Sequence, residues 1–215
     1  MTTASPPKPA RTAFYVAMVM LGLTVAQLAY ATFGGSDLQQ FKSKAFGARL
    51  VLYPAMMLAV PAVWWFVARR RGSDSPIPWA GVAFIMEPFL VDVTGNSLNL
   101  YDKIDWWDDV NHFVNWGFMS FGIGILLRRA KDVPAWAVGS MVAGFGAILA
   151  IIWEVGEWYT FIRHGTELDT AYEDTLFDEV LGTSGATVAA LLTVWLIRRA
   201  AQPRAPAPAP SPQAA

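Results

Sequence analysis

Cysteine is absent from the 215 residues, and only 15% of the residues are charged. Without cysteine the chain can form neither disulfides nor thiolate metal sites, and it has no thiol nucleophile. A soluble domain of this length carries about a quarter charged residues, so this chain has too little polar material to coat a globule. Hydrophobic residues make up 54% of the sequence. The composition therefore predicts a membrane protein.

Several catalytic signatures are missing as well. The sequence contains no Walker A loop, no Gly-x-Ser-x-Gly, no His-Glu-x-x-His and no repeated histidine pair of the membrane-desaturase kind. These absences argue against nucleotide hydrolysis and against serine-hydrolase chemistry. We expect the lipid bilayer to be the partner of this chain and expect no binding of nucleic acid.

Six long apolar runs predict an all-α fold, a polytopic membrane helix bundle with six transmembrane helices. About 20 apolar residues are needed to cross the hydrocarbon of a bilayer. The runs cover 12–33, 48–68, 79–100, 109–127, 134–161 and 175–197. We predict a disordered tail over 1–11, the six-span domain over 12–200, and a disordered Pro/Ala-rich tail over 201–215. Residues 29–31 resemble a signal-peptidase site, so cleavage of residues 1–31 stays open.

The basic residues predict how the bundle is oriented. If the N-terminus is cytoplasmic, the cytoplasmic segments hold 11 bases and the outer segments hold 5. The positive-inside rule then places both termini in the cytoplasm, and we expect a multi-pass protein of the cell (inner) membrane. The cytoplasmic set is Lys8, Arg11, Arg69, Arg70, Arg71, Arg128, Arg129, Lys131, Arg198, Arg199 and Arg204, and the outer set is Lys42, Lys44, Arg49, Lys103 and Arg163.

Three polar stretches interrupt the last three apolar runs. Residues 108–113 (Asp-Asp-Val-Asn-His-Phe) open the fourth run, residues 153–158 (Trp-Glu-Val-Gly-Glu-Trp) end the fifth, and residues 174–178 (Asp-Thr-Leu-Phe-Asp) open the sixth. Within each stretch, ionisable residues three or four apart share one helix face. At 1.5 Å per residue, Asp108, Glu154 and Asp178 each lie roughly 30 Å from the cytoplasmic end of their span. We therefore expect the three stretches to meet on the extracytoplasmic side.

Carboxylates gathered at one depth with few nearby bases would repel one another, and a bound cation would remove that repulsion. Oxygen ligands with one histidine suit Mg²⁺, Mn²⁺, Ca²⁺ or Zn²⁺, so the predicted cofactor is a divalent metal ion. Single acids could instead cap helices or line a solvated rim, but Glu154 and Glu157 lie at the end of a helix that disfavours acids. The predicted ligands are Asp108, Asp109, His112, Glu154, Glu157, Asp174 and Asp178, with Glu154 and Glu157 also as candidate catalytic residues.

The third run carries two ionisable residues of its own. Glu87 lies about 13.5 Å along its span, near mid-bilayer, where an ionisable side chain is a functional candidate. The alternative is a protonated, hydrogen-bonded core residue. Asp92, Asn96 and Asn99 continue toward the outer side and predict a polar stripe that leads to the acidic site.

Small residues spaced four apart predict close packing among the last three helices. Such pairs let helix backbones approach each other in lipid. The pairs are Ser120/Gly124, Ser140/Gly144, Gly182/Ala186 and Gly185/Ala189.

The three polar stretches resemble those of the YjdF-like family of small bacterial inner-membrane proteins. The match rests on Asp108-x-x-x-His112-Phe113, on Trp153-Glu154-x-x-Glu157-Trp158, and on Asp174-Thr175-x-x-Asp178 followed by Gly185-Ala186. The Asp-x-x-x-His start is also similar, more distantly, to VanZ-like proteins. The chain departs from the family at Asp109, where a base is more common, so either Asp108 or Asp109 can be the equivalent residue. The family has no assigned activity, and the resemblance implies the fold and the site residues but no function.

Three functions stay open at this point. The first is a metal-dependent hydrolase of a lipid or envelope-linked substrate, in which the metal polarises an ester or phosphoryl oxygen or activates water. The second is a cation or proton-coupled transporter with Glu87 and Asp92 as its relay, although residues 79–86 offer no ionisable group to continue it. The third is a structural membrane protein whose acids bridge helices as protonated pairs.

Overall fold

The computed structural model describes residues 8–130, 132–160, 162–164 and 168–202. Throughout this part of the chain the secondary structure is helical, without any strand, which confirms the all-α prediction. The long helices are α1 (Lys8–Ala29), α2 (Phe46–Arg70), α3 (Trp79–Ser97), α4 (Trp107–Leu127), α5 (Ala135–Thr160) and α6 (Ala171–Ala201). Three short helical turns are η1 (Tyr30–Gly34), η2 (Gln39–Phe41) and η3 (Ile162–His164).

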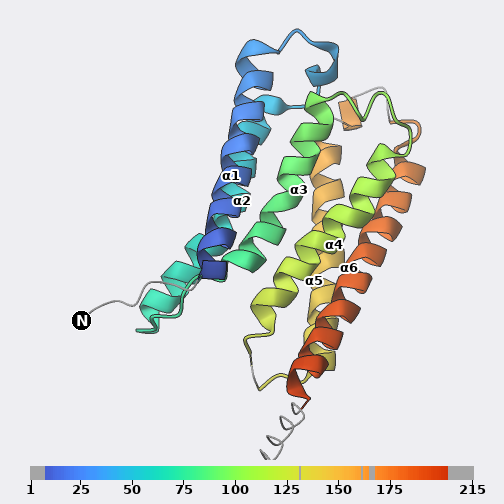
Figure 1. Ribbon diagram of the computed structural model, residues 1–215. Coiled ribbons are helices and arrows are strands. Elements are labelled where there is room, and N and C mark those ends of the chain that lie inside the picture. Colours follow the sequence, from blue (N-terminus) through green and yellow to red (C-terminus); the bar gives the residue numbers. More distant parts are fainter. Residues whose placement is uncertain (1–7, 131, 161, 165–167, 203–215) are drawn as a thin grey trace, which may run out of the picture.

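Helix α3 lies between two groups of helices (Figure 1). On one side it packs against α1 and α2, and on the other side against α4, which in turn packs against α5 and α6. Eleven of the 19 residues of α3 are buried. Because its neighbours cover it, α3 can carry polar residues that a lipid-facing helix could not.

Five helical segments of the described chain are long and apolar enough to cross a membrane: Ala10–Gly34, Phe46–Arg70, Trp107–Leu127, Ala135–Thr160 and Ala171–Ala201. Helix α3 is not among them, because Glu87, Asp92 and Asn96 lower its hydropathy. The chain therefore has the helices of a multi-pass membrane protein, while the count of six spans stays a prediction.

The first and last helices extend beyond the predicted runs. Helix α1 begins at Lys8, so residues 8–11, which the sequence assigns to a tail, are helical. Pro9 is compatible with this start, since the first turn of a helix needs no N–H donor. Helix α6 begins at Ala171, with Glu173 and Asp174 in its first turn. Acidic side chains at this position interact favourably with the helix dipole. The rest of the predicted tails, residues 1–7 and 203–215, lies outside the described residues.

Glycine brings α4 and α6 into close contact next to the predicted site. A Cβ atom at Gly185 would overlap the backbone carbonyl of Phe113, and one at Gly182 would lie 2.7 Å from the Trp116 ring. The small-residue packing predicted for these positions is confirmed. Gly144 differs, because a Cβ atom there would meet no atom within 4 Å. The close approach at Gly182 and Gly185 fixes the spacing between the polar faces of α4 and α6.

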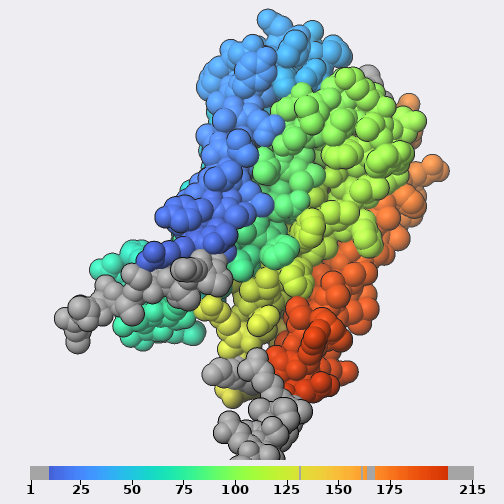
Figure 2. All heavy atoms as spheres, viewed as in Figure 1, coloured from blue at the N-terminus to red at the C-terminus, as the bar shows by residue number. Residues whose placement is uncertain are grey.

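The two ends of the bundle differ in charge. One end carries the C-terminal ends of α2, α4 and α6 (Figure 1), and its arginines include Arg69, Arg70, Arg128, Arg198 and Arg199. At the other end the α1–α2 connection and the α3–α4 connection lie next to each other (Figure 2). A hydrogen bond from Gln40 to the Ser97 carbonyl oxygen, 3.1 Å long, joins these connections. The three polar stretches lie toward this second end.

Candidate metal centre

A cavity of about 790 Å³ opens at the end of the bundle where the α1–α2 and α3–α4 connections meet. Helix α4 turns a polar face toward it, with Asp108, Asn111, His112 and Asn115 in its wall. This face follows from the sequence, because these residues are spaced three or four apart and therefore project from one side of a helix. Residues from all three polar stretches line this one cavity.

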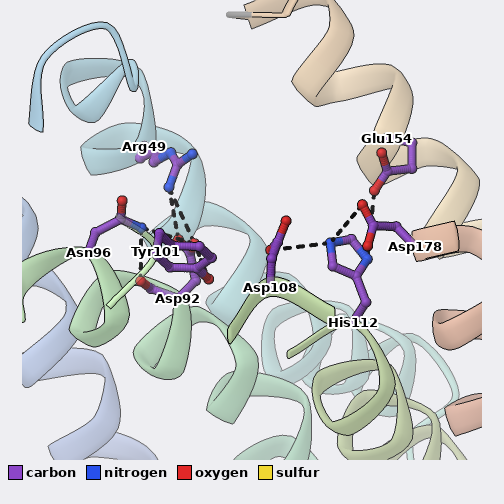
Figure 3. A network of polar contacts seen from close by, with 8 residues as sticks. All are labelled: Arg49, Asp92, Asn96, Tyr101, Asp108, His112, Glu154 and Asp178. Carbon is purple, nitrogen blue, oxygen red and sulfur yellow. Dashed lines mark hydrogen bonds and ion pairs between the residues drawn. The ribbon is translucent and has the colours of Figure 1, made fainter. Parts of the chain in front are cut away.

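His112 stands at the centre of the group that the structure brings together. Its Nε2 atom lies 3.7 Å from Oδ1 of Asp108 and 3.8 Å from Oδ2 of Asp178 (Figure 3). One ligand atom from each of the three residues can be chosen so that all lie within 4.8 Å of one another. Two ligands of a tetrahedral zinc ion, with bonds of about 2.0–2.2 Å, are roughly 3.4 Å apart. Small side-chain shifts would therefore let these atoms hold one cation.

The other ring nitrogen of His112 faces Glu154 from α5. Its Nδ1 atom lies 3.7 Å from Oε1 of Glu154, and both side chains are only 6% exposed. Neither atom has a hydrogen-bond partner within the described residues. A buried polar atom without a partner costs about 1–3 kcal/mol. In metal sites a carboxylate often accepts the N–H of the histidine nitrogen that does not bind the metal, which fixes the ring. Glu154 is placed for this role, because Nε2 then faces the two aspartates.

A second buried carboxylate, Asp92 of α3, is fully paired in contrast. Arg49 donates to its Oδ2 at 3.0 Å and Tyr53 donates to the same oxygen at 2.7 Å. Tyr101 and Asn96 donate to Oδ1 at 3.2 and 3.3 Å (Figure 3). Burial and the nearby carboxylates of Asp92 and Asp108 raise the pKa of the Tyr101 hydroxyl, so that it stays protonated as a donor. Asp92 therefore stabilises the cavity wall, and its oxygens already have four donors.

The remaining predicted site residues divide into two groups. Glu157 of α5 and Asp174 of α6 line the same cavity as His112. Asp109 belongs neither to the cluster of possible ligands nor to the cavity lining, so the structure brings Asp108 and not Asp109 to the centre. Glu87 also lies outside the cavity lining, and its Oε2 atom is buried without a hydrogen-bond partner among the described residues.

Arg49 is a site residue that the sequence patterns do not identify. It belongs to the outer set of bases, yet it lies in the first turn of α2 with its side chain 12% exposed and paired to Asp92. A base inside the predicted run 48–68 was the available signal, since a buried charge requires a partner. The prediction of few bases near the acids is therefore wrong at this position, and part of the expected repulsion is offset.

One family model matches residues 16–199, from within α1 to the last turn of α6, and its description is "Predicted membrane protein (DUF2238)". Searches of the curated proteins and of the solved structures gave no match. The family match covers the cavity and all three polar stretches.

Proposed function

We propose that this chain, which belongs to the DUF2238 family of predicted membrane proteins, binds a divalent metal ion through Asp108, His112 and Asp178. The observation that carries the proposal is a pair of buried atoms, Nδ1 of His112 and Oε1 of Glu154, that have no hydrogen-bond partner among the described residues, beside three ligand atoms within 4.8 Å of one another. A cation bound at Nε2 would leave the Nδ1–H group to Glu154. The resemblance to YjdF-like proteins rests on the same residues and is part of this proposal.

The activity that we propose is metal-dependent hydrolysis of a lipid or envelope-linked substrate. A bound divalent ion supplies a polarised ester or phosphoryl oxygen, or a hydroxide at neutral pH. Glu157 lines the cavity outside the three-residue cluster, which suits it to accept a proton from water. Phe89, Trp116 and Trp153 also line the cavity, so a substrate with both polar and apolar parts would fit.

Transport is the weaker alternative. The cavity is lined on α3 by Pro88 and by residues that follow it, and not by Glu87 or any residue before it. Asp92, the other residue of the proposed relay, is held by four donors. A transported ion would need polar groups through the other half of the bundle, and residues 79–86 of α3 have no ionisable side chain. These observations favour a site that opens to one side only.

The proposed site faces the extracytoplasmic side of the cell membrane. The arginine-rich ends of α2, α4 and α6 lie at the opposite end of the bundle (Figure 1). Under the positive-inside rule that end is cytoplasmic, together with both termini. A reporter fused into the α5–α6 connection should behave as extracytoplasmic, and cytoplasmic behaviour would reverse this orientation.

Metal content of the purified protein tests the metal site directly. We expect about one divalent ion per wild-type chain by elemental mass spectrometry, and none in the double variant His112→Gln/Asp178→Asn. The matched control is Asp109→Asn, which removes one carboxylate next to the cluster and should keep the ion. If the wild type binds no Mg²⁺, Mn²⁺, Ca²⁺ or Zn²⁺ after incubation with each, the acids only bridge helices, as in the structural alternative.

A further inference from the structure

The cavity has a basic wall as well as an acidic centre. Lys42, Lys44 and Arg49 all line it, whereas Lys103 and Arg163 do not. The three lining bases come from one short segment, residues 42–49, between η2 and the first turn of α2. Figure 3 shows Arg49 and His112 on opposite sides of Asp108, with their side chains on different elements. We call residues 42–49 the basic segment.

Two carboxylates hold two of the three bases beside the cavity. The Nη1 atom of Arg49 lies 3.0 Å from Asp92, and the Nζ atom of Lys44 lies 3.1 Å from Asp102. Both carboxylates also line the cavity. A guanidinium has five N–H donors in a fixed plane, which suits it to contact a carboxylate and a second anion together. The ion pairs therefore orient Arg49 and Lys44 at the cavity.

The backbone of the basic segment is strained at two positions. Ser43 and Ala45, on either side of Lys44, have φ values of 62° and 53°. Within the described chain Asn99 is the one other residue besides glycine with a positive φ, and it also lines the cavity. Residues held in this backbone conformation are strained and gather at ligand-binding sites. The strain sets the course of the backbone around Lys44, on the cavity side of the segment.

Helix α2 begins between two of the lining bases, Lys44 and Arg49. Ala45 is its N-cap residue, and no side chain of the described residues caps the helix there. The first amides of a helix have no partner within the helix and form the positive end of its dipole. An anion beside Lys44 would interact with both.

We propose that the basic segment binds a phosphoryl group, at a position from which one phosphoryl oxygen reaches the metal centre. A phosphoryl group carries several oxygens on one atom, so it can contact bases and a cation at the same time. A carboxylate has only two oxygens and one charge. The ligand is either a phosphorylated lipid head group, whose apolar part contacts Phe89, Trp116 and Trp153, or a free phosphate. The metal contact rests on the proposed function, whereas the contacts to the bases do not.

Calorimetric titration of the full chain in a phosphate-free neutral detergent tests this proposal. The probes are dihexanoyl phosphatidic acid, inorganic phosphate, dihexanoylglycerol and hexanoate, each with and without the divalent ion. We expect the phosphatidic acid to bind, and the variant Lys42→Gln/Lys44→Gln to weaken its binding at least about tenfold, as the loss of charge-assisted hydrogen bonds requires. The control Lys103→Gln removes a base from the same end of the bundle but outside the cavity, and should bind as the wild type does.

The results distinguish a lipid head group from a free phosphate as the ligand, and they test the phosphoryl site separately from the metal centre. Equal binding of inorganic phosphate supports a free phosphate as ligand, and binding of the phosphatidic acid alone supports a lipid head group. Hexanoate or dihexanoylglycerol binding as tightly as the phosphatidic acid would overturn the proposal. So would wild-type affinity in the double lysine variant, or no binding by the wild type. Lysine-dependent phosphate binding by a protein that takes up no metal would refute the metal centre and support the basic segment.

Discussion

The cavity wall contains two ion pairs of nearly equal length that differ in burial. Arg49 and Asp92 are 3.0 Å apart and each is 12% exposed, while Lys44 and Asp102 are 3.1 Å apart and 25% and 42% exposed. At an effective dielectric constant near 20, the attraction over 3 Å is roughly 5–6 kcal/mol. In an exposed pair, screening and side-chain entropy reduce the net stabilisation to about 0–1 kcal/mol. Removing one partner of a buried pair leaves an unpaired charge and costs about 3–5 kcal/mol.

We therefore expect Arg49→Met to lower the free energy of unfolding by about 3–5 kcal/mol, and Lys44→Gln to lower it by less than about 1 kcal/mol. For a chain of this size these values correspond to a decrease in Tm of about 6–20 °C and of less than about 4 °C. Tyr53, Tyr101 and Asn96 still donate to Asp92 in the arginine variant, which favours the lower end of the first range. Thermal unfolding of the purified protein in detergent, followed by tryptophan fluorescence, measures both.

The double variant Arg49→Met/Asp92→Asn separates the cost of an unpaired buried charge from the cost of the lost packing. Because it leaves no buried charge, it should be more stable than Arg49→Met alone. Equal decreases in Tm for Arg49→Met and Lys44→Gln would contradict the role of burial. So would a double variant that is less stable than Arg49→Met alone.

Three further predictions concern the metal centre and its support. At a free concentration of the divalent ion of 100 times its Kd, the wild type should be stabilised by about 2.7 kcal/mol. In thermal-shift assays the Asp178→Asn variant should lose this stabilisation, and the Asp109→Asn variant should keep it. Glu154→Gln should lower cation affinity about 10–100-fold, because the His112 ring loses its orienting carboxylate; an unchanged Kd by calorimetry would contradict this role. Gly185→Ala should destabilise the protein by about 1–3 kcal/mol through overlap with α4. Gly144→Ala, at an open position, should be neutral or stabilising by up to about 1 kcal/mol; equal effects on Tm would argue against the glycine contact.

The helices and the meeting of the polar stretches could be predicted because both depend on local regularities. Apolar run length predicts a helix that can cross the bilayer, and a rise of 1.5 Å per residue places Asp108, Glu154 and Asp178 at one depth. Small residues at Gly182 and Gly185 predicted that α4 and α6 would come close. The structure agrees on these points, since the three polar stretches contact one another around His112.

The rotation of each helix and the contacts distant in sequence could not be predicted. Asp108 and Asp109 differ by about 100° around α4, and only packing against the other helices decides which one faces His112. Arg49 pairs with a residue of a different helix, Asp92, and no local pattern encodes that contact. For the same reason the sequence did not indicate a basic wall facing the acidic centre.

The burial of α3 by its neighbouring helices bears on how the chain is inserted into the membrane. A nascent helix enters the bilayer from the translocon according to its own hydrophobicity, and α3 is the long helix that falls short on this measure. If α3 crosses the membrane, as the sequence predicts, its retention there would depend on its main neighbours, α4 and α1, and on Arg49 of α2, which neutralises Asp92. Insertion of α3 would then be cooperative with that of its neighbours, and the residue pair that supports the cavity wall would also promote insertion.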